Sequence, residues 1–231
     1  MGTIRLACGL AIAVAGMVSW LGVYQTGVAA PTAPVGVVTA KESFKYYDVS
    51  GKTLDDLRRD VFARGPYDAI KGQRFAGWTS WNIRWWLDYQ TVSEGCAVGQ
   101  AATETHVTYT LPRWKDAAKA PIELQESWAR FSGALTEHEQ GHGHLARELG
   151  ARIKTAIERL PPQPTCEQLN RHAGDLAHRM IWEDEEQEAY DRRTGHGATQ
   201  GASFPRILVR AQGTATSEAI TGHAAQRETT R

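Results

Sequence analysis

The sequence predicts an α+β fold, in which a small antiparallel sheet near the N-terminal side packs on one long helix and on a second, C-terminal helix. Two runs within residues 79–111 alternate apolar and polar side chains, which is typical of a half-buried β-hairpin. Residues 121–160 and 166–191 instead repeat apolar side chains every three or four positions, which is the period of an amphipathic helix.

The composition is that of a globular protein. The 231 residues, 42% of them hydrophobic and 23% charged, suit one domain of ordinary size or at most two small ones. Lys and Arg total 26, as do Asp and Glu, so the formal net charge is zero. This balance argues against a nucleic-acid binder, which needs a basic excess, and against a polybasic membrane-surface protein.

The N-terminal segment is expected to direct export. Arg5 precedes an uncharged run over residues 6–24, and residues 28–30 resemble the small-residue end of a secretory signal. The run also approaches the length that spans a bilayer, and Pro31 would hinder cleavage. Residues 1–30 are therefore either a cleaved signal peptide or an uncleaved anchor, and we expect the rest to be periplasmic or secreted, with membrane contact only through this segment.

The folded domain is expected to span residues 43–207. Residues 31–42, which contain prolines among small neighbours, predict a linker, and residues 208–231 predict a disordered tail. Inside the domain, residues 44–49 are expected to form a short strand. A helix follows, with Thr53 as its N-cap and Phe62 on its apolar face.

Two cysteines, Cys96 and Cys166, remain after the export segment. In an oxidising compartment an even pair predicts a disulfide, and two free thiols are the alternative. The bridge would close a loop of about 70 residues, for which chain entropy predicts a stabilisation of about 4 kcal/mol.

The chemistry lies on the long helix, where residues 138–142 read His-Glu-Gln-Gly-His, an H-E-x-x-H motif. At about 100° per residue, His138 and His142 lie about 40° apart and one turn along the helix, so both imidazoles can bind one zinc ion. Glu139 can then reach a water molecule on the metal. The apolar stripe of the helix passes through both histidines, where a polar group without a partner is costly. Core histidines hydrogen-bonded within the protein are the alternative.

The third metal ligand must come from further along the chain. One zincin class breaks the helix at a glycine three residues after the second histidine, but here that residue is Leu145, and His144 and Glu148 point away from the metal side. His196 lies between two glycines, in a loop free of helical constraint. Asp191 is expected to be an ordinary helix acid or to orient a ligand imidazole. The candidates are His172, His178, the acidic cluster 183–188, Asp191 and His196.

With these motifs the chain resembles a family of bacterial proteins of unknown function described as secreted zinc-dependent proteases. The matching segments are 46–53, 77–85, 111–114, Trp128 with Phe131, 138–142, Cys166 and 190–201, within residues 44–205. The resemblance implies export, a zincin-like domain and one zinc ion per chain. It also favours His196 as the third ligand, because this residue lies in a family-like segment.

The predicted function is that of an exported zinc-dependent peptidase acting on peptides or proteins. Zinc bound by His138, His142 and His196 would lower the pKa of a bound water to about 7. Glu139 would take a proton from that water and return it to the leaving amine. Tyr190 is a candidate donor to the oxyanion, with packing at a helix end as the alternative.

A second class of function is an exported, non-catalytic binding module that zinc stabilises. Trp81 and Trp85 are expected in the core, whereas Trp78 and Trp86 share the other face with Arg84 and could bind a peptide or a cell-wall glycan. An open position on the zinc favours the enzyme. A fourth protein ligand favours the module. The sequence predicts no oligomeric state.

Overall fold

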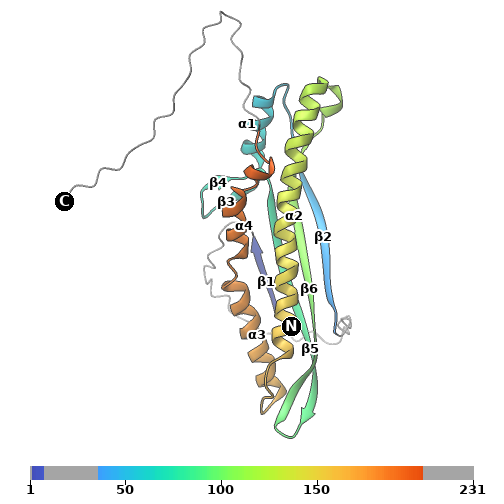
Figure 1. Cartoon of the computed structure of the whole chain (residues 1–231), viewed down its shortest axis with the longest axis vertical. Helices are drawn as coiled ribbons and strands as arrows, with labels where there is room; N and C mark the ends of the chain where they lie inside the picture. Colours follow the sequence, from blue (N-terminus) through green and yellow to red (C-terminus); the bar gives the residue numbers. More distant parts are fainter. Residues whose placement is uncertain (1, 8–35, 205–231) are drawn as a thin grey trace, which may run out of the picture.

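The computed structural model describes residues 2–7 and 36–204, and this part of the chain forms an elongated α+β structure (Figure 1). Helix α2 (Ile122–Glu158) runs along a four-stranded sheet for most of the length of the molecule. The chain then reverses, and α3 (Cys166–Trp182) and α4 (Glu186–Thr194) run back beside α2. The α+β prediction is therefore confirmed.

The sheet is mixed, so the predicted all-antiparallel sheet is wrong. Its order is β1-β5-β6-β2, with the strands β1 (Gly2–Ala7), β2 (Val38–Val49), β5 (Trp78–Val92) and β6 (Gly95–Trp114). β1 and β6 both pair antiparallel to β5, and β5 with β6 forms the predicted hairpin, but β2 pairs parallel to β6. Residues 50–77 connect β2 to β5 and are long enough to cross over β6. The pattern of apolar and polar side chains in β2 could therefore not specify whether β2 runs parallel or antiparallel to its neighbour.

Residues 50–77 form α1 and a small hairpin. α1 (Leu54–Arg64) begins as predicted, because the Thr53 side chain accepts a hydrogen bond from the backbone N–H of Asp56 at 3.1 Å. Phe62 differs from the prediction, since it is 46% exposed. The strands β3 (Tyr67–Asp68) and β4 (Gln73–Arg74) then pair antiparallel before the chain enters β5.

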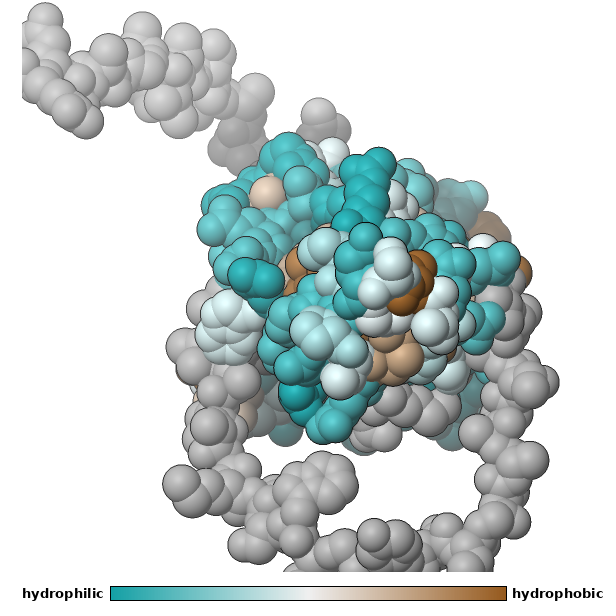
Figure 2. Space-filling model, turned by 90° about the horizontal axis from the view of Figure 1, so that it is seen from below, coloured by the Kyte–Doolittle hydropathy of each residue, from teal (hydrophilic) through white to brown (hydrophobic). Residues whose placement is uncertain are grey.

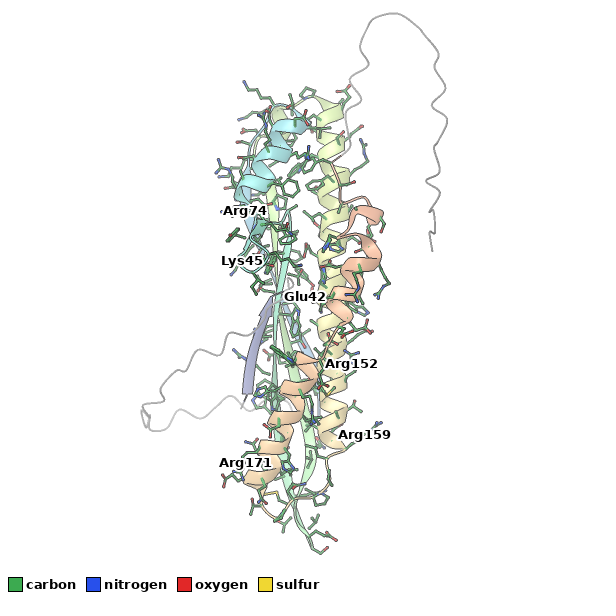
Figure 3. All side chains as sticks on the ribbon, turned by 90° about the vertical axis from the view of Figure 1, so that its left-hand side faces the viewer. Glu42, Lys45, Arg74, Arg152, Arg159 and Arg171 are labelled. Atoms are coloured by element: carbon green, nitrogen blue, oxygen red, sulfur yellow. A yellow bond between two sulfur atoms is a disulfide. The ribbon has the colours of Figure 1, made fainter. Side chains whose placement is uncertain are left out.

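The predicted helix 166–191 is broken into α3 and α4. The break falls in the acidic run, where several carboxylates would repel one another on one helix. Asp184 lies in the break and accepts a hydrogen bond at 2.6 Å from Arg152, which projects from α2 toward this junction (Figure 3). The break redirects the chain. As a result, α4 packs against a part of α2 that is nearer the N-terminus of α2 than the part beside α3.

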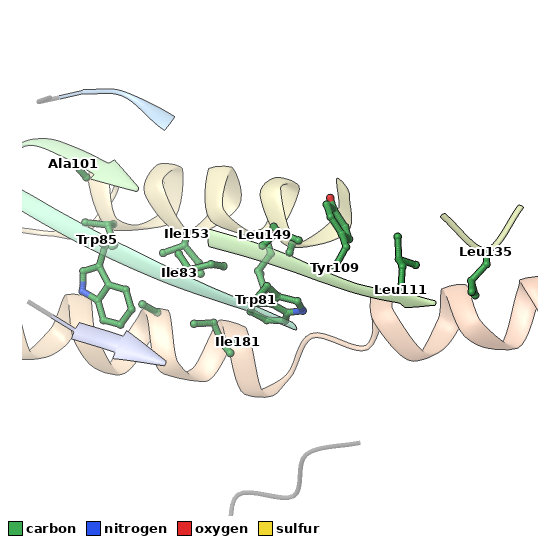
Figure 4. Close-up of a cluster of buried hydrophobic side chains, with 14 of the residues drawn as sticks. Trp81, Ile83, Trp85, Ala101, Tyr109, Leu111, Leu135, Leu149, Ile153 and Ile181 are labelled. Atoms are coloured by element: carbon green, nitrogen blue, oxygen red, sulfur yellow. The ribbon is translucent and has the colours of Figure 1, made fainter. Parts of the chain in front are cut away.

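The core lies between one face of the sheet and the helices. Trp81, Ile83 and Trp85 alternate along β5 on the buried face, as predicted, and meet α2 residues such as Leu149 and Ile153 (Figure 4). Each such side chain contributes about 1.5–3 kcal/mol when it is removed from water. The core therefore fixes α2 on the sheet and sets which of its side chains face inward.

The end of the molecule at which α2 joins α3 is held by a covalent bond. Cys96 and Cys166 form a disulfide across 70 residues of sequence, as predicted. Next to it, Cys96 and Gln163 exchange two backbone hydrogen bonds of 2.8 Å. The surface at this end is mainly hydrophilic, with small apolar patches (Figure 2).

The described residues cover only part of the segments for which the sequence predicts an export signal, a linker and a tail. The backbone of Gly2–Ala7 pairs with β5, whereas the remainder of the expected export segment lies outside the described residues, as does the expected tail 208–231. β2 begins at Val38, inside the segment expected to be a linker, because Val37, Val38 and Thr39 are β-branched and favour a strand. Across the described ranges, no helix has both the length and the apolar character required to cross a membrane.

The described residues also contain two short 3₁₀ helices, η1 (Ala117–Lys119) and η2 (Ala198–Gln200). η1 links β6 to α2. η2 follows α4 and contacts both α4 and α2, so it returns the end of the domain to the middle of the long helix.

Candidate metal centre

The H-E-x-x-H motif lies on the inward face of α2, as the apolar stripe predicts. His138, Glu139 and His142 are only 4%, 5% and 3% exposed. Leu135 before the motif and Ala146 after it are buried as well, so the core continues on both sides of the polar residues. The two imidazoles are adjacent, with ring centroids 4.9 Å apart.

The side chain that faces both imidazoles is Asp191 of α4. Its Oδ1 atom lies 3.3 Å from Nε2 of His138 and 3.0 Å from Nε2 of His142. Two ligand atoms of a tetrahedral zinc ion are separated by about 3.3 Å, given bond lengths near 2.0–2.1 Å. In the described part of the chain, His138, His142 and Asp191 form a group whose ligand atoms all lie within 4.8 Å of one another, and this group could hold a metal ion.

Two glutamine side chains orient the imidazoles. Nδ1 of His138 lies 2.9 Å from the amide oxygen of Gln200, and Nδ1 of His142 lies 2.7 Å from the amide oxygen of Gln187. The NH₂ group of each glutamine holds the amide in that orientation. The NH₂ group of Gln200 donates to the Tyr190 hydroxyl at 3.0 Å. The NH₂ group of Gln187 donates to the backbone carbonyl of His142 at 3.3 Å.

This arrangement fits a cation. An amide oxygen can only accept, so each Nδ1 carries the proton and each neutral imidazole presents the lone pair of Nε2. Both lone pairs then face Oδ1 of Asp191, and three electron-rich atoms meet in a buried site. A metal ion between them would satisfy all three atoms at once.

Glu139 lies beside this group, in a pocket formed by β5. Its Oε2 accepts a hydrogen bond of 2.6 Å from the Thr79 hydroxyl, which is also 3.0 Å from the backbone carbonyl of Glu139. Gly77 gives the carboxylate its space, because a Cβ at that position would come within 2.9 Å of Cδ of Glu139. Burial raises the pKa of Glu139, and the Thr79 hydrogen bond opposes this change. The carboxyl is therefore a stronger base than an exposed glutamate.

Asp191 is perturbed in the opposite direction. Burial alone would raise the pKa of Asp191, but hydrogen bonds from His138 and His142, when these imidazoles are protonated, hold it well below its usual value. The carboxyl is therefore charged at neutral pH, as a metal ligand must be.

His196, the expected third ligand, lies just outside the group. Its Nδ1 is 3.2 Å from the other carboxylate oxygen of Asp191, Oδ2, and its side chain is 57% exposed. The residue has a φ of 52°, in the left-handed region, between Gly195 and Gly197. Gly197 also packs on His138, where a Cβ would lie 2.9 Å from Cγ of the ring. The loop therefore packs against His138 through Gly197 and contacts Asp191 through His196.

Tyr190, the candidate oxyanion donor, packs behind the imidazoles. Its ring stacks on His138, with centroids 5.1 Å apart, and its hydroxyl accepts the hydrogen bond from Gln200. Gly141 makes room for it, because a side chain there would collide with the hydroxyl. These contacts favour the alternative prediction for Tyr190, in which the residue packs at a helix end and does not donate to an oxyanion.

The remaining histidine and acidic candidates are not brought to the group. His172 and His178 are exposed on α3, and the ring of His178 packs against Trp85. The carboxylates of residues 183–188 are absent from the described metal-binding group.

A cavity of about 180 Å³ opens beside the metal-binding residues. It is lined by Phe62, Lys71, Phe75, Ala76, Gly77, Trp78, Leu135, His138, Glu139, His142, Asp191, His196 and Ala202. Trp78, expected on the outward face of β5, thus faces this cavity. Tyr190 is not among the lining residues, so its hydroxyl serves Gln200 and not the cavity.

Sequence reasoning missed the roles of Gln187, Gln200 and Thr79, and it ranked Asp191 below His196. One signal was available, since Gln187 and Asp191 are four residues apart and therefore share a face of any helix that contains both. Gln200 and Thr79 gave no such signal, because only the fold brings them to α2.

Comparison with known proteins agrees with the family resemblance and goes no further. A family model described as a bacterial protein of unknown function (DUF922) matches residues 44–197. No curated protein and no solved structure matches the chain. The protease description and the zincin-like fold therefore remain predictions, as do export and the peptide substrate.

Proposed function

The chain belongs to this bacterial family of unknown function, and we propose that it is a zinc-dependent hydrolase of peptide bonds. The observation that carries the proposal is the convergence of two Nε2 atoms and one carboxylate oxygen beside a buried glutamate. Three protein ligands with an open fourth position are typical of catalytic zinc sites, whereas structural sites are closed by four. This arrangement favours the enzyme over the binding module.

We assign His138, His142 and Asp191 as the three ligands, in place of the set with His196. When bound, zinc supplies a Lewis acid and a nucleophilic water at neutral pH. A carboxylate ligand leaves the site with a net charge near +1, and two neutral imidazoles complete it. His196 then holds the second oxygen of Asp191 and fixes the direction of that carboxylate.

Glu139 carries the acid–base step. Its carboxylate accepts the proton of the attacking water and later donates it to the nitrogen of the leaving amine. The raised pKa of the buried carboxyl suits both steps, because it holds the proton between them. Thr79 and Gly77 position the carboxylate and keep it beside the ligands.

The proposal is tested by Glu139→Gln, which keeps the shape of the side chain and removes the base. We expect zinc near one ion per chain by elemental analysis, while turnover of a fluorogenic peptide library falls at least ~100-fold. The matched control is Glu137→Gln, an exposed glutamate on the same helix, which should leave turnover unchanged.

Retained activity in Glu139→Gln would contradict the mechanism. A zinc-loaded wild-type protein that cleaves no peptide in the library would contradict the function. It would instead favour the non-catalytic module.

A further inference from the structure

The cavity beside the metal-binding group has an aromatic wall and a cation. Phe62 comes from α1, Phe75 follows β4, and Trp78 begins β5, so three separate segments supply the aromatic side chains. Phe75 lies 5.8 Å from Trp78 and 6.4 Å from His196, measured between ring centroids, and so connects the wall to the site. Among the described residues that line the cavity, Lys71 alone is a lysine or arginine.

The hairpin that carries Lys71 is held firmly. Asp68 is buried, and its Oδ1 accepts hydrogen bonds from the backbone N–H groups of Ile70 and Lys71 at 2.8 and 3.1 Å. Arg74, visible on this hairpin in Figure 3, donates to the carbonyl of Gly65 at 2.6 Å. These contacts fix the backbone at Lys71, and its Nζ lies 5.5 Å from the centre of the Phe75 ring.

Three large apolar side chains are exposed on the segments that supply the cavity wall. Phe62, Tyr67 and Ile70 are 46%, 57% and 51% exposed, and all belong to α1 or to the hairpin that follows it. Phe62 is the one of these three that lines the cavity, so its exposed ring is open to an apolar partner there. An apolar side chain of a substrate is the partner that this chemistry fits.

We infer that the cavity recognises a peptide in which a large apolar residue stands next to a carboxylate. The apolar side chain packs on Phe62, Phe75 and Trp78, and Lys71 pairs with the adjacent carboxylate, supplied by an acidic residue. That the partner is a peptide rests on the proposed hydrolysis. The recognition itself requires only the aromatic wall and the Lys71 ammonium.

The test uses matched peptides with a central Phe or Ala, flanked by Glu, Gln or Lys. For the wild-type protein we expect kcat/KM to be about two- to fivefold higher with Glu than with Gln beside Phe, the size of an exposed ion pair. Lys71→Gln should abolish this preference, and Lys71→Glu should reverse it toward Lys. Phe62→Ala should reduce the preference for Phe over Ala about fivefold.

Lys119→Glu is the control, because Lys119 is an exposed lysine that does not line the cavity. It should leave every preference unchanged. Affinities of the same peptides for the zinc-loaded Glu139→Gln protein provide a second measurement that requires no turnover.

The outcomes separate the two proposals. Cleavage or binding that ignores the flanking charge in both wild type and Lys71→Glu overturns the recognition. Binding that depends on Lys71, without any cleavage by the wild type, supports the recognition and overturns hydrolysis. A zinc-loaded protein that neither binds nor cleaves any of the peptides overturns both.

Discussion

Two segments of α2, its C-terminal part and its middle, are stabilised in different ways. Near its C-terminus, Leu149, Ile153 and Ile157 pack on the sheet, and the Cys96–Cys166 disulfide closes that end. About 20 Å from Ile153 along the helix, near its middle, His138, Glu139 and His142 also face inward and contact polar groups. The C-terminal part is apolar and lies beside a covalent bond, while the middle holds polar groups joined by hydrogen bonds and could hold a metal ion.

This difference indicates how the site is kept in place. The disulfide end fixes α2 against β6 and the start of α3, so the helix carries the motif on a rigid support. The middle of α2 can then hold buried polar groups that contribute little stability of their own. Removing a component from one of these two segments should leave the other nearly unchanged.

The largest effect is expected from removing the disulfide. The double variant Cys96→Ser/Cys166→Ser should lose about 4 kcal/mol of unfolding free energy, because the bridge closes a long loop in the unfolded chain. Urea unfolding monitored by tryptophan fluorescence measures it. The zinc affinity of the folded variant should stay within about threefold of the wild type, since the ligands do not touch the bridge. A parallel fall in zinc affinity would show that the disulfide and the metal-binding group are coupled.

The next effect distinguishes the two candidate third ligands. Asp191→Ala removes a carboxylate that faces both imidazoles, so we expect zinc affinity to fall more than ~100-fold, beyond the range for a group that only supports a ligand. His196→Ala removes a neighbour of that carboxylate and should cost less than about tenfold. Competition with a chromophoric chelator measures both. The opposite order would restore His196 as the ligand.

A smaller effect is expected from the glutamine that orients His138. Gln200→Leu removes the acceptor for Nδ1 and should weaken zinc binding about 10–100-fold. Gln200→Glu keeps an acceptor at the same place and should bind zinc at least as well as the wild type. Equal losses in the two variants would mean that residue 200 acts by packing and not by orienting the imidazole.

The features that the sequence predicted well all have local signals. The hairpin of β5 and β6, the helix that carries H-E-x-x-H and the Thr53 N-cap each follow from residues close together in the chain. The disulfide followed from counting, since two cysteines remained after the segment expected to direct export. Burial of both histidines followed from the stripe, because a helix places residues four apart on one face.

The features that were wrong or missed depend on distant residues. The direction of β2 is set by its pairing with β6, and the break after α3 is stabilised by Arg152 from another helix. His196 was favoured because a glycine-flanked loop permits many positions. Asp191 reached the site because that break turned α4, which no periodicity in the sequence records.

The Thr79 hydroxyl has one hydrogen and two acceptors within reach, both on Glu139. While the carboxylate is charged, the hydroxyl donates to Oε2. Once Oε2 carries a proton, that proton can point at the Thr79 oxygen, and the hydroxyl turns to the backbone carbonyl instead. In both states Oε2 and the Thr79 hydroxyl hydrogen have a partner, so the glutamate can gain and lose a proton during a cycle without leaving either of them unpaired. Valine, equal in shape to threonine, would remove this exchange while leaving the packing intact.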